Sequence, residues 1–122
     1  MDLNFRLEIL KNSSQISDDT MNKMLQTIEV IDKLCGIKLN EENGSMLITH
    51  MAIAIERIKK EEFIEFQDED MHGQIKAHHK FYIAEKVLCE LEKNLKIHFQ
   101  KGEQWFILMH LCALLGGDDV KV

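Results

Sequence analysis

The absence of proline limits the fold of this chain more than any other feature of its sequence. Average usage would give about six prolines in a chain of this length, but the 122 residues contain none. Proline marks turns, edge strands and rigid linkers, so its absence favours a mostly helical domain without a long linker. The length is typical of one domain, and such a domain buries enough apolar surface to fold without a disulfide or a metal.

The charge balance argues against nucleic acid as a direct partner. The chain has 15 Lys and Arg against 21 Asp and Glu, a formal net charge of −6, and its basic residues are not gathered into a phosphate-binding patch. Its longest apolar run, Trp105–Leu115, is interrupted by His110 and is too short to cross a bilayer. No basic segment followed by an apolar one opens the chain, so we expect a cytoplasmic protein without membrane contact.

The cysteines predict the same compartment. Cys35, Cys89 and Cys112 are odd in number, lack CxxC spacing and lie among apolar residues. We expect them to be reduced thiols that face the core.

Apolar residues recur at intervals of three and four along most of the chain, which predicts an all-α fold, a compact bundle of about five helices. The expected helices cover residues 3–11, 41–58, about 75–95 and 103–115, and a further helix follows a cap at Asp18 or Asp19 and extends through Leu34. The last helix is apolar on nearly all sides and is expected at the centre of the bundle. The acidic segment 61–70 is predicted to be a loop.

Capping signals mark several helix boundaries. Asp18 or Asp19 is expected to cap the second helix and Gly36 to end it. Asn40 is expected to cap the third helix. Gly102 is expected to separate the fourth helix from the last.

We expect three segments along the chain. Residues 1–17 form an N-terminal helix or arm, residues 18–116 form the main helical domain, and residues 117–122 form a polar, frayed tail.

His50 and Arg57 form the first candidate functional pair. Seven residues turn a helix by about 700°, so Arg57 lies two turns beyond His50 on nearly the same face. A neighbouring guanidinium disfavours imidazolium, and the unprotonated ring nitrogen is a nucleophile for a phosphoryl group that arginine can bind through two hydrogen bonds. The alternative is a hydrogen-bonded helix histidine beside a solvated arginine.

Glu103 and His110 form the second candidate pair. His110 interrupts an apolar helix, and a buried polar ring without a partner costs about 1–3 kcal/mol. Glu103 lies on the same helical line about 10 Å away along the axis, so the two can edge one pocket without touching. The alternative is a core histidine that hydrogen-bonds a backbone carbonyl.

Other kinds of site lack their motifs. No HxxxH pair can bind a metal from one helix, Gly44-Ser45 and Gly116-Gly117 lack the lysine of a phosphate loop, and no nucleophile–base pair marks an enzyme. His78 and His79 are adjacent and are expected to point to different faces of their helix. We therefore expect no catalytic activity, no metal and no cofactor.

Two segments together resemble the signatures of the PTS regulation domain, a module of the bacterial sugar phosphotransferase system (PTS). Residues 46–58 (MLITHMAIAIERI) contain a Leu, a His and an Arg seven residues after the His. Residues 103–111 (EQWFILMHL) contain a Glu followed seven residues later by a His within an apolar helix. The resemblance covers residues 18–116, with Phe106 where tyrosine is common.

The resemblance implies a five-helix bundle that dimerises and receives phosphate on histidine. His50 and His110 match the phosphoacceptor positions, and Arg57 and Glu103 are the residues expected to support the phosphate site. The implied donors are the histidine-containing phosphocarrier protein or an enzyme IIB component. Adding nearly two negative charges beside an arginine is expected to reorganise packing and so to change the dimer.

The resemblance also sets expectations about partners. Members of the family usually carry two copies of the domain behind an RNA-binding antiterminator domain or a helix-turn-helix, whereas this sequence shows one copy. We therefore expect a stand-alone homodimeric sensor that controls transcription or carbohydrate metabolism through a protein partner. The alternatives are a dimerisation or interaction module that takes no phosphate, and a metal- or ligand-binding bundle that uses His50, His98 and His110.

Overall fold

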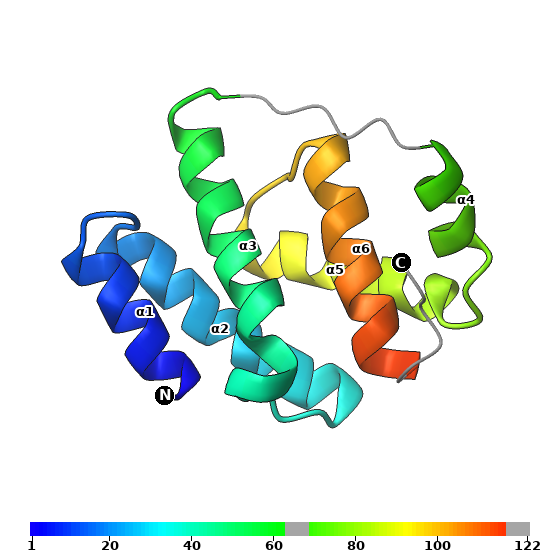
Figure 1. Ribbon diagram of the computed structural model, residues 1–122, viewed down its shortest axis with the longest axis horizontal. Coiled ribbons are helices and arrows are strands. Elements are labelled where there is room, and N and C mark those ends of the chain that lie inside the picture. Colours follow the sequence, from blue (N-terminus) through cyan, green and yellow to red (C-terminus); the bar gives the residue numbers. More distant parts are fainter. Residues whose placement is uncertain (63–68, 117–122) are drawn as a thin grey trace. The chain divides into compact units, whose positions relative to one another are not determined.

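The computed structural model of the chain describes residues 1–62 and 69–116 (Figure 1). These residues form six helices and no strand: α1 (Leu3–Asn12), α2 (Asp18–Cys35), α3 (Glu41–Lys59), α4 (Glu69–Lys76), α5 (Phe81–Leu95) and α6 (Lys101–Gly116). The all-α prediction is confirmed, with six helices where about five were expected. The chain divides into two compact units, residues 1–62 and 63–122, and each is described by itself.

The first unit contains α1, α2 and α3, and each of these helices packs against the other two (Figure 1). The predicted apolar positions of α1 are all buried: Leu3, Leu7 and Leu10. The apolar side chains that α2 and α3 bury are Met24, Ile31, Leu47, Ile48, Met51, Ala52, Ala54 and Ile55. Burial of these faces is the main source of stability for the unit.

Ser17, rather than Asp18 or Asp19, caps α2. Ser17 has an extended backbone (φ −87°, ψ 169°), and its Oγ accepts a hydrogen bond from the backbone N–H of Thr20 at 3.1 Å. The predicted cap was wrong because both aspartates already lie in the first helical turn, where their charges face the positive end of the helix dipole. Gly36 ends α2 as predicted, with a φ of 67° that favours glycine.

Asn40 caps α3 as predicted, through a reciprocal pair of hydrogen bonds. Its side chain accepts from the backbone N–H of Asn43 at 2.9 Å, and the Asn43 side chain accepts from the backbone N–H of Asn40 at 2.7 Å. Glu41 and Glu42 follow in the first turn, where the helix dipole favours negative charge.

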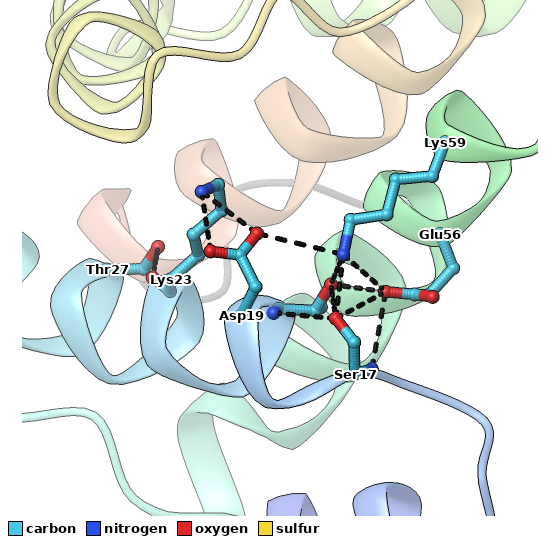
Figure 2. A network of polar contacts seen from close by, with 7 residues as sticks. Ser17, Asp19, Lys23, Thr27, Glu56 and Lys59 are labelled. Atoms are coloured by element: carbon cyan, nitrogen blue, oxygen red, sulfur yellow. Dashed lines mark hydrogen bonds and ion pairs between the residues drawn. The ribbon is translucent and has the colours of Figure 1, made fainter.

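A network of polar side chains joins the start of α2 to the end of α3 (Figure 2). The carboxylate of Glu56 accepts hydrogen bonds from the hydroxyl of Thr20 and, at 3.5 Å, from the backbone N–H of Ser17. Nζ of Lys59 donates to the hydroxyl oxygens of Ser17 at 2.7 Å and Thr20 at 2.9 Å, and lies 3.7 Å from Oδ2 of Asp19. Burial alone would raise the pKa of Glu56, but the hydrogen bonds from Thr20 and Lys59 hold it below its ordinary value. The network therefore satisfies the polar groups that the packing of α2 on α3 withdraws from water.

The second unit contains α4, α5 and α6, and α6 packs against both of the others (Figure 1). The buried face of α5 consists of Ala84, Val87, Leu88, Leu91 and Leu95. As predicted, α6 buries side chains around much of its circumference: Glu103, Trp105, Ile107, Leu108, Leu111 and Cys112.

The predicted helix over residues 75–95 is interrupted by a turn at 77–80. In this turn Nδ1 of His78 accepts a hydrogen bond from the backbone N–H of Lys80 at 3.0 Å. The rings of His78 and His79 stack with their centroids 4.7 Å apart, so the expectation that they point to different helix faces was also wrong. Apolar periodicity cannot detect a side chain that bonds the backbone locally, because it follows only the apolar positions.

Gly102 does not separate α5 from α6 but lies in the first turn of α6. The separation comes earlier, where Lys96 adopts a left-handed conformation (φ 56°) and the fully buried ring of Phe99 anchors the connection. Oε2 of Glu92 accepts hydrogen bonds from the backbone N–H of Phe99 at 2.8 Å and from the side-chain amide of Gln104 at 3.1 Å. These bonds fix the connection. The predicted helix end at residue 95 is confirmed, whereas the last helix begins at Lys101, two residues before the predicted start.

The cysteine prediction is confirmed for one residue and wrong for another. Cys112 is buried, Cys35 is half-buried and Cys89 is exposed, and all three are free thiols. Burial raises the pKa of Cys112 to about 11. The prediction was wrong for Cys89, which lies on the exposed side of α5 although apolar residues lie close to it in the sequence.

Two predicted segments fall wholly or partly beyond the described residues. In the predicted loop 61–70, residues 63–68 lie outside them, and the last two residues begin α4 instead of continuing the loop. The predicted tail at 117–122 also lies outside them. Within residues 1–62 and 69–116, no helix combines the length and apolarity needed to cross a membrane.

Candidate functional site

One face of α3 forms an open depression in the first unit. Its volume is about 280 Å³, and it is lined by Arg6, Ser45, Met46, Thr49, His50, Ile53 and Arg57. All of these residues except Arg6, which lies on α1, belong to α3. Ser45, Thr49, Ile53 and Arg57 follow one another at four-residue spacing, which aligns them along one ridge of the helix.

His50 and Arg57, the pair proposed from the sequence, both line this depression. Both side chains are half-buried, so part of each is in contact with solvent. Their common lining agrees with the two-turn spacing that places them on nearly the same helix face.

Arg6 also lines the depression, although no motif in the sequence points to it. Its Nε lies 3.0 and 3.1 Å from the two carboxylate oxygens of Glu41, and its Nη2 also donates to this carboxylate. The pair joins α1 to the first turn of α3, and the hydrogen bond from Arg6 holds the pKa of Glu41 below its ordinary value. Because Arg6 is on a different helix, no spacing rule links it to His50, and only the packing of α1 against α3 does so.

Ser45 and Thr49 add two hydroxyl groups to the same ridge. Oγ1 of Thr49 is buried and has no hydrogen-bond partner in the described part of the chain, which is an energetic cost in the absence of a partner. The lining thus combines an imidazole, two guanidinium groups and two hydroxyls. Such a set suits an anion with several acceptor oxygens, and the imidazole adds a nucleophile.

Glu103 and His110, the second proposed pair, lie on α6 in the second unit. The side chain of Glu103 is fully buried, with 1% of its surface exposed, whereas His110 is half-buried. Of the two, His110 is therefore the side chain that a solvent-borne reactant can reach. The two proposed pairs belong to different units, and each is described within its own.

Trp105 is the centre of an aromatic cluster in the second unit that sequence reasoning did not identify. The ring of His72 stacks on Trp105 with centroids 4.2 Å apart, and the ring of Phe81 lies at 6.3 Å. Nζ of Lys76 is 5.6 Å from the Trp105 ring centroid. These contacts tie α4 and the start of α5 to α6, and we interpret them as packing.

The metal-binding alternative finds no support in the described residues. Among them, no group of three or more His, Cys, Asp or Glu side chains is arranged to hold a metal ion. Nδ1 of His98, one of the three histidines considered for such a site, lies 3.5 Å from Oε2 of Glu92.

The family of the chain follows from a comparison with known proteins. The PRD domain model matches residues 25–114, and the chain belongs to this family of regulatory domains, which are in general not catalytic. The matched span contains both proposed pairs but excludes α1 and therefore Arg6.

Three relatives illustrate the range of proteins that share this similarity. The chain is 26% identical over 109 residues to the uncharacterized protein YhfY of Escherichia coli, and the aligned region covers 89% of the chain and 91% of YhfY. It is 36% identical over 77 residues to the probable licABCH operon regulator of Bacillus subtilis, and this aligned region covers 63% of the chain and 12% of the regulator. It is 26% identical over 99 residues to the protein GlcT of Staphylococcus epidermidis, and this aligned region covers 79% of the chain and 34% of GlcT. No solved structure shows significant similarity to the chain.

Proposed function

We propose that this chain is a phosphorylatable regulatory module of the sugar phosphotransferase system. It receives a phosphoryl group on histidine and controls transcription or carbohydrate metabolism through a protein partner. Membership of the PRD domain family supports the regulatory role, and one relative is described as an operon regulator.

The observation that carries the proposal is the position of His50. Its imidazole lines an open depression together with Arg57, Arg6 and the hydroxyls of Ser45 and Thr49. A phosphoryl group on this ring would lie among donors that suit its oxygens. A helix histidine with no functional role does not require two guanidinium groups in the same depression.

The proposed transfer uses the unprotonated ring nitrogen of His50 as the nucleophile. This nitrogen attacks the phosphorus of a phosphohistidine on the donor protein, forming a new N–P bond as the N–P bond of the donor breaks. The electron pair of the broken bond returns to the donor imidazole, which can then take up a proton. The product carries nearly two negative charges beside Arg57, which stabilises it through charge-assisted hydrogen bonds.

His110 is proposed as a second acceptor, with Glu103 as the residue that supports it. His110 is half-buried, so part of the residue is in contact with solvent. The buried carboxylate of Glu103 lies earlier on α6, where it can help to fix the surroundings of the helix face that carries His110.

The proposal names partners of three kinds. The donors are the histidine-containing phosphocarrier protein or an enzyme IIB component. The output partner is another protein, because the net charge of −6 disfavours nucleic acid. A second copy of the chain completes a homodimer, in a module that uses no cofactor and works in the cytoplasm.

Phosphorylation with purified donors tests the proposal. The chain is incubated with phosphorylated phosphocarrier protein or phosphorylated enzyme IIB, and the phosphoryl group is detected and located by mass spectrometry. We expect an acid-labile phosphate on the wild type, a lower yield in each of His50→Ala and His110→Ala, and no phosphate in the double variant.

His98→Ala provides a matched control for histidine accessibility. The side chain of His98 is 87% exposed and does not line the depression, so its replacement should leave the yield unchanged. Absence of phosphate on the wild type with both donors, or an unchanged yield in the double variant, would overturn the proposal. Partner binding without any phosphorylation would then favour the interaction-module alternative.

A further inference from the structure

Arg6 lines the depression together with His50 and forms an ion pair with Glu41. Nε and Nη2 of Arg6 donate hydrogen bonds to the carboxylate of Glu41. None of the hydrogen bonds that Arg6 makes in the described residues uses Nη1, which carries two further N–H donors. Since Arg6 lines the depression, this guanidinium has both the position and the donors to contact an anion there.

We propose that Arg6 is a second arginine of the phosphoryl site at His50, and that a phosphoryl group on His50 competes with Glu41 for it. This inference rests on the proposed function, because it concerns the same depression. It adds a residue that the family match over residues 25–114 does not include.

The competition follows from the charges of the two anions. The carboxylate of Glu41 carries one negative charge, whereas a phosphoryl group carries nearly two and offers three acceptor oxygens. Arginine binds either anion through paired N–H donors, and the more highly charged anion is favoured. Arg57 lines the depression two helical turns beyond His50, so the phosphoryl group would be held by one arginine from α3 and one from α1.

The consequence is a change in how α1 is held. Arg6 connects α1 to the first turn of α3, and Leu3, Leu7 and Leu10 form the buried apolar face of α1. When Arg6 moves to the phosphoryl group, α1 loses its link to Glu41 but keeps its apolar contacts. Phosphorylation would therefore shift α1 along α3 rather than detach it, which gives the module a structural response within one unit.

Chemical phosphorylation with potassium phosphoramidate tests this inference without any protein donor. In this reaction the N–P bond of phosphoramidate breaks as the His50 nitrogen forms its own bond to phosphorus, and ammonia leaves. The rate of phosphorylation at His50 is measured by mass spectrometry in the His110→Ala background. The variants compared are Arg6→Gln, Arg6→Lys and Glu41→Gln, with Lys11→Gln and Glu42→Gln as controls that change the same charges outside the depression.

We expect Arg6→Gln to slow phosphorylation about tenfold, since a charge-assisted hydrogen bond is worth roughly one decade in a rate or equilibrium constant. Arg6→Lys should lie between Arg6→Gln and the wild type, because lysine keeps the charge but loses the paired donors. Glu41→Gln should match or exceed the wild-type rate, because it releases Arg6 from its competitor. Both controls should leave the rate unchanged.

Arg6→Gln and Glu41→Gln both break the ion pair, but only Arg6→Gln removes the guanidinium. Comparing them separates the role of Arg6 in holding α1 from its proposed role in binding the phosphoryl group. Equal losses of rate in the two variants would mean that Arg6 acts only by holding α1, and the inference would fail. An unchanged rate in Arg6→Gln, or no phosphorylation of His50 by phosphoramidate, would also overturn it. If phosphoramidate modifies His50 in an Arg6-dependent way while neither PTS donor does so, the proposed donor relationship fails and the inference about Arg6 stands.

Amide hydrogen exchange gives an independent readout of α1. After phosphorylation of His50, exchange along residues 3–12 should rise in the wild type and should remain unchanged in Arg6→Gln, in which the ion pair is already absent. Unchanged exchange in the phosphorylated wild type would contradict the proposed competition.

Discussion

Replacing Gly116 with alanine tests the packing at the end of α6. The same replacement at Gly73 serves as the comparison, because we expect it to raise the free energy of unfolding whereas Gly116→Ala should lower it. Both glycines lie in helices of the second unit, and neither has a positive φ. In an open helical position, glycine to alanine raises stability by about 0.5–1 kcal/mol. A Cβ added at Gly73 meets no atom within 4 Å, so we expect this gain in Gly73→Ala.

At Gly116 an added Cβ would lie 2.5 Å from Cε1 and 3.0 Å from Nε2 of His78. The His78 ring cannot turn aside freely, because its Nδ1 accepts a hydrogen bond from the backbone N–H of Lys80 and its face stacks on His79. Overpacking costs about 1–3 kcal/mol, and the gain in helix propensity is small at the last residue of a helix. We expect Gly116→Ala to lower the free energy of unfolding by about 1–2 kcal/mol.

Urea denaturation at neutral pH, followed by far-ultraviolet circular dichroism, measures both variants against the wild type. Their free energies of unfolding should lie on opposite sides of the wild-type value and differ from each other by about 1.5–3 kcal/mol. In a His78→Ala background the two closest contacts are absent and only Cε1 of His79, at 3.3 Å, remains near the added Cβ, so most of the cost of Gly116→Ala should disappear. If Gly116→Ala proves as stable as Gly73→Ala, or if His78→Ala brings no relief, the proposed contact between the turn and α6 is refuted.

Three further predictions follow from other contacts. Because the pKa of Glu56 is held below its ordinary value of 4.5, its carboxylate stabilises the fold above that pH, and this contribution is lost as the pH falls through the folded-state pKa. The urea midpoint of Glu56→Gln should therefore be lower than wild type at pH 7 and should fall less steeply below about pH 4.5; identical pH profiles would contradict this. A thiol reagent should label the exposed Cys89 in the native protein and the buried Cys112 only after unfolding, which mass spectrometry of timed samples would check. Asn40→Ala should cost about 1 kcal/mol in urea unfolding through loss of the α3 cap, and a change below the error of the measurement would mean that the cap contributes little.

Local signals in the sequence were sufficient where one residue and its near neighbours decide the structure. Asn40 caps α3 and Gly36 ends α2 as predicted, because a cap depends on hydrogen bonds or backbone angles within about one helical turn. The placement of His50 and Arg57 on one face of α3 is of the same kind, since helix geometry alone relates positions seven apart.

Predictions failed where a side chain makes a bond that periodicity does not encode. The turn around His78 divides the expected long helix, and the hydrogen bonds of Glu92 set the connection before α6. In both places the apolar pattern is compatible with more than one boundary, and a single polar contact selects between them.

The all-helical fold and the positions of the two histidine signatures could be predicted from the residues alone, because apolar periodicity and motif spacing are properties of the chain. The position of Arg6 in the same depression as His50, and its pairing with Glu41, became visible in the folded structure. The physical reason is that this contact depends on how α1 packs against α3, and packing joins residues whose separation along the chain carries no information about their distance in space.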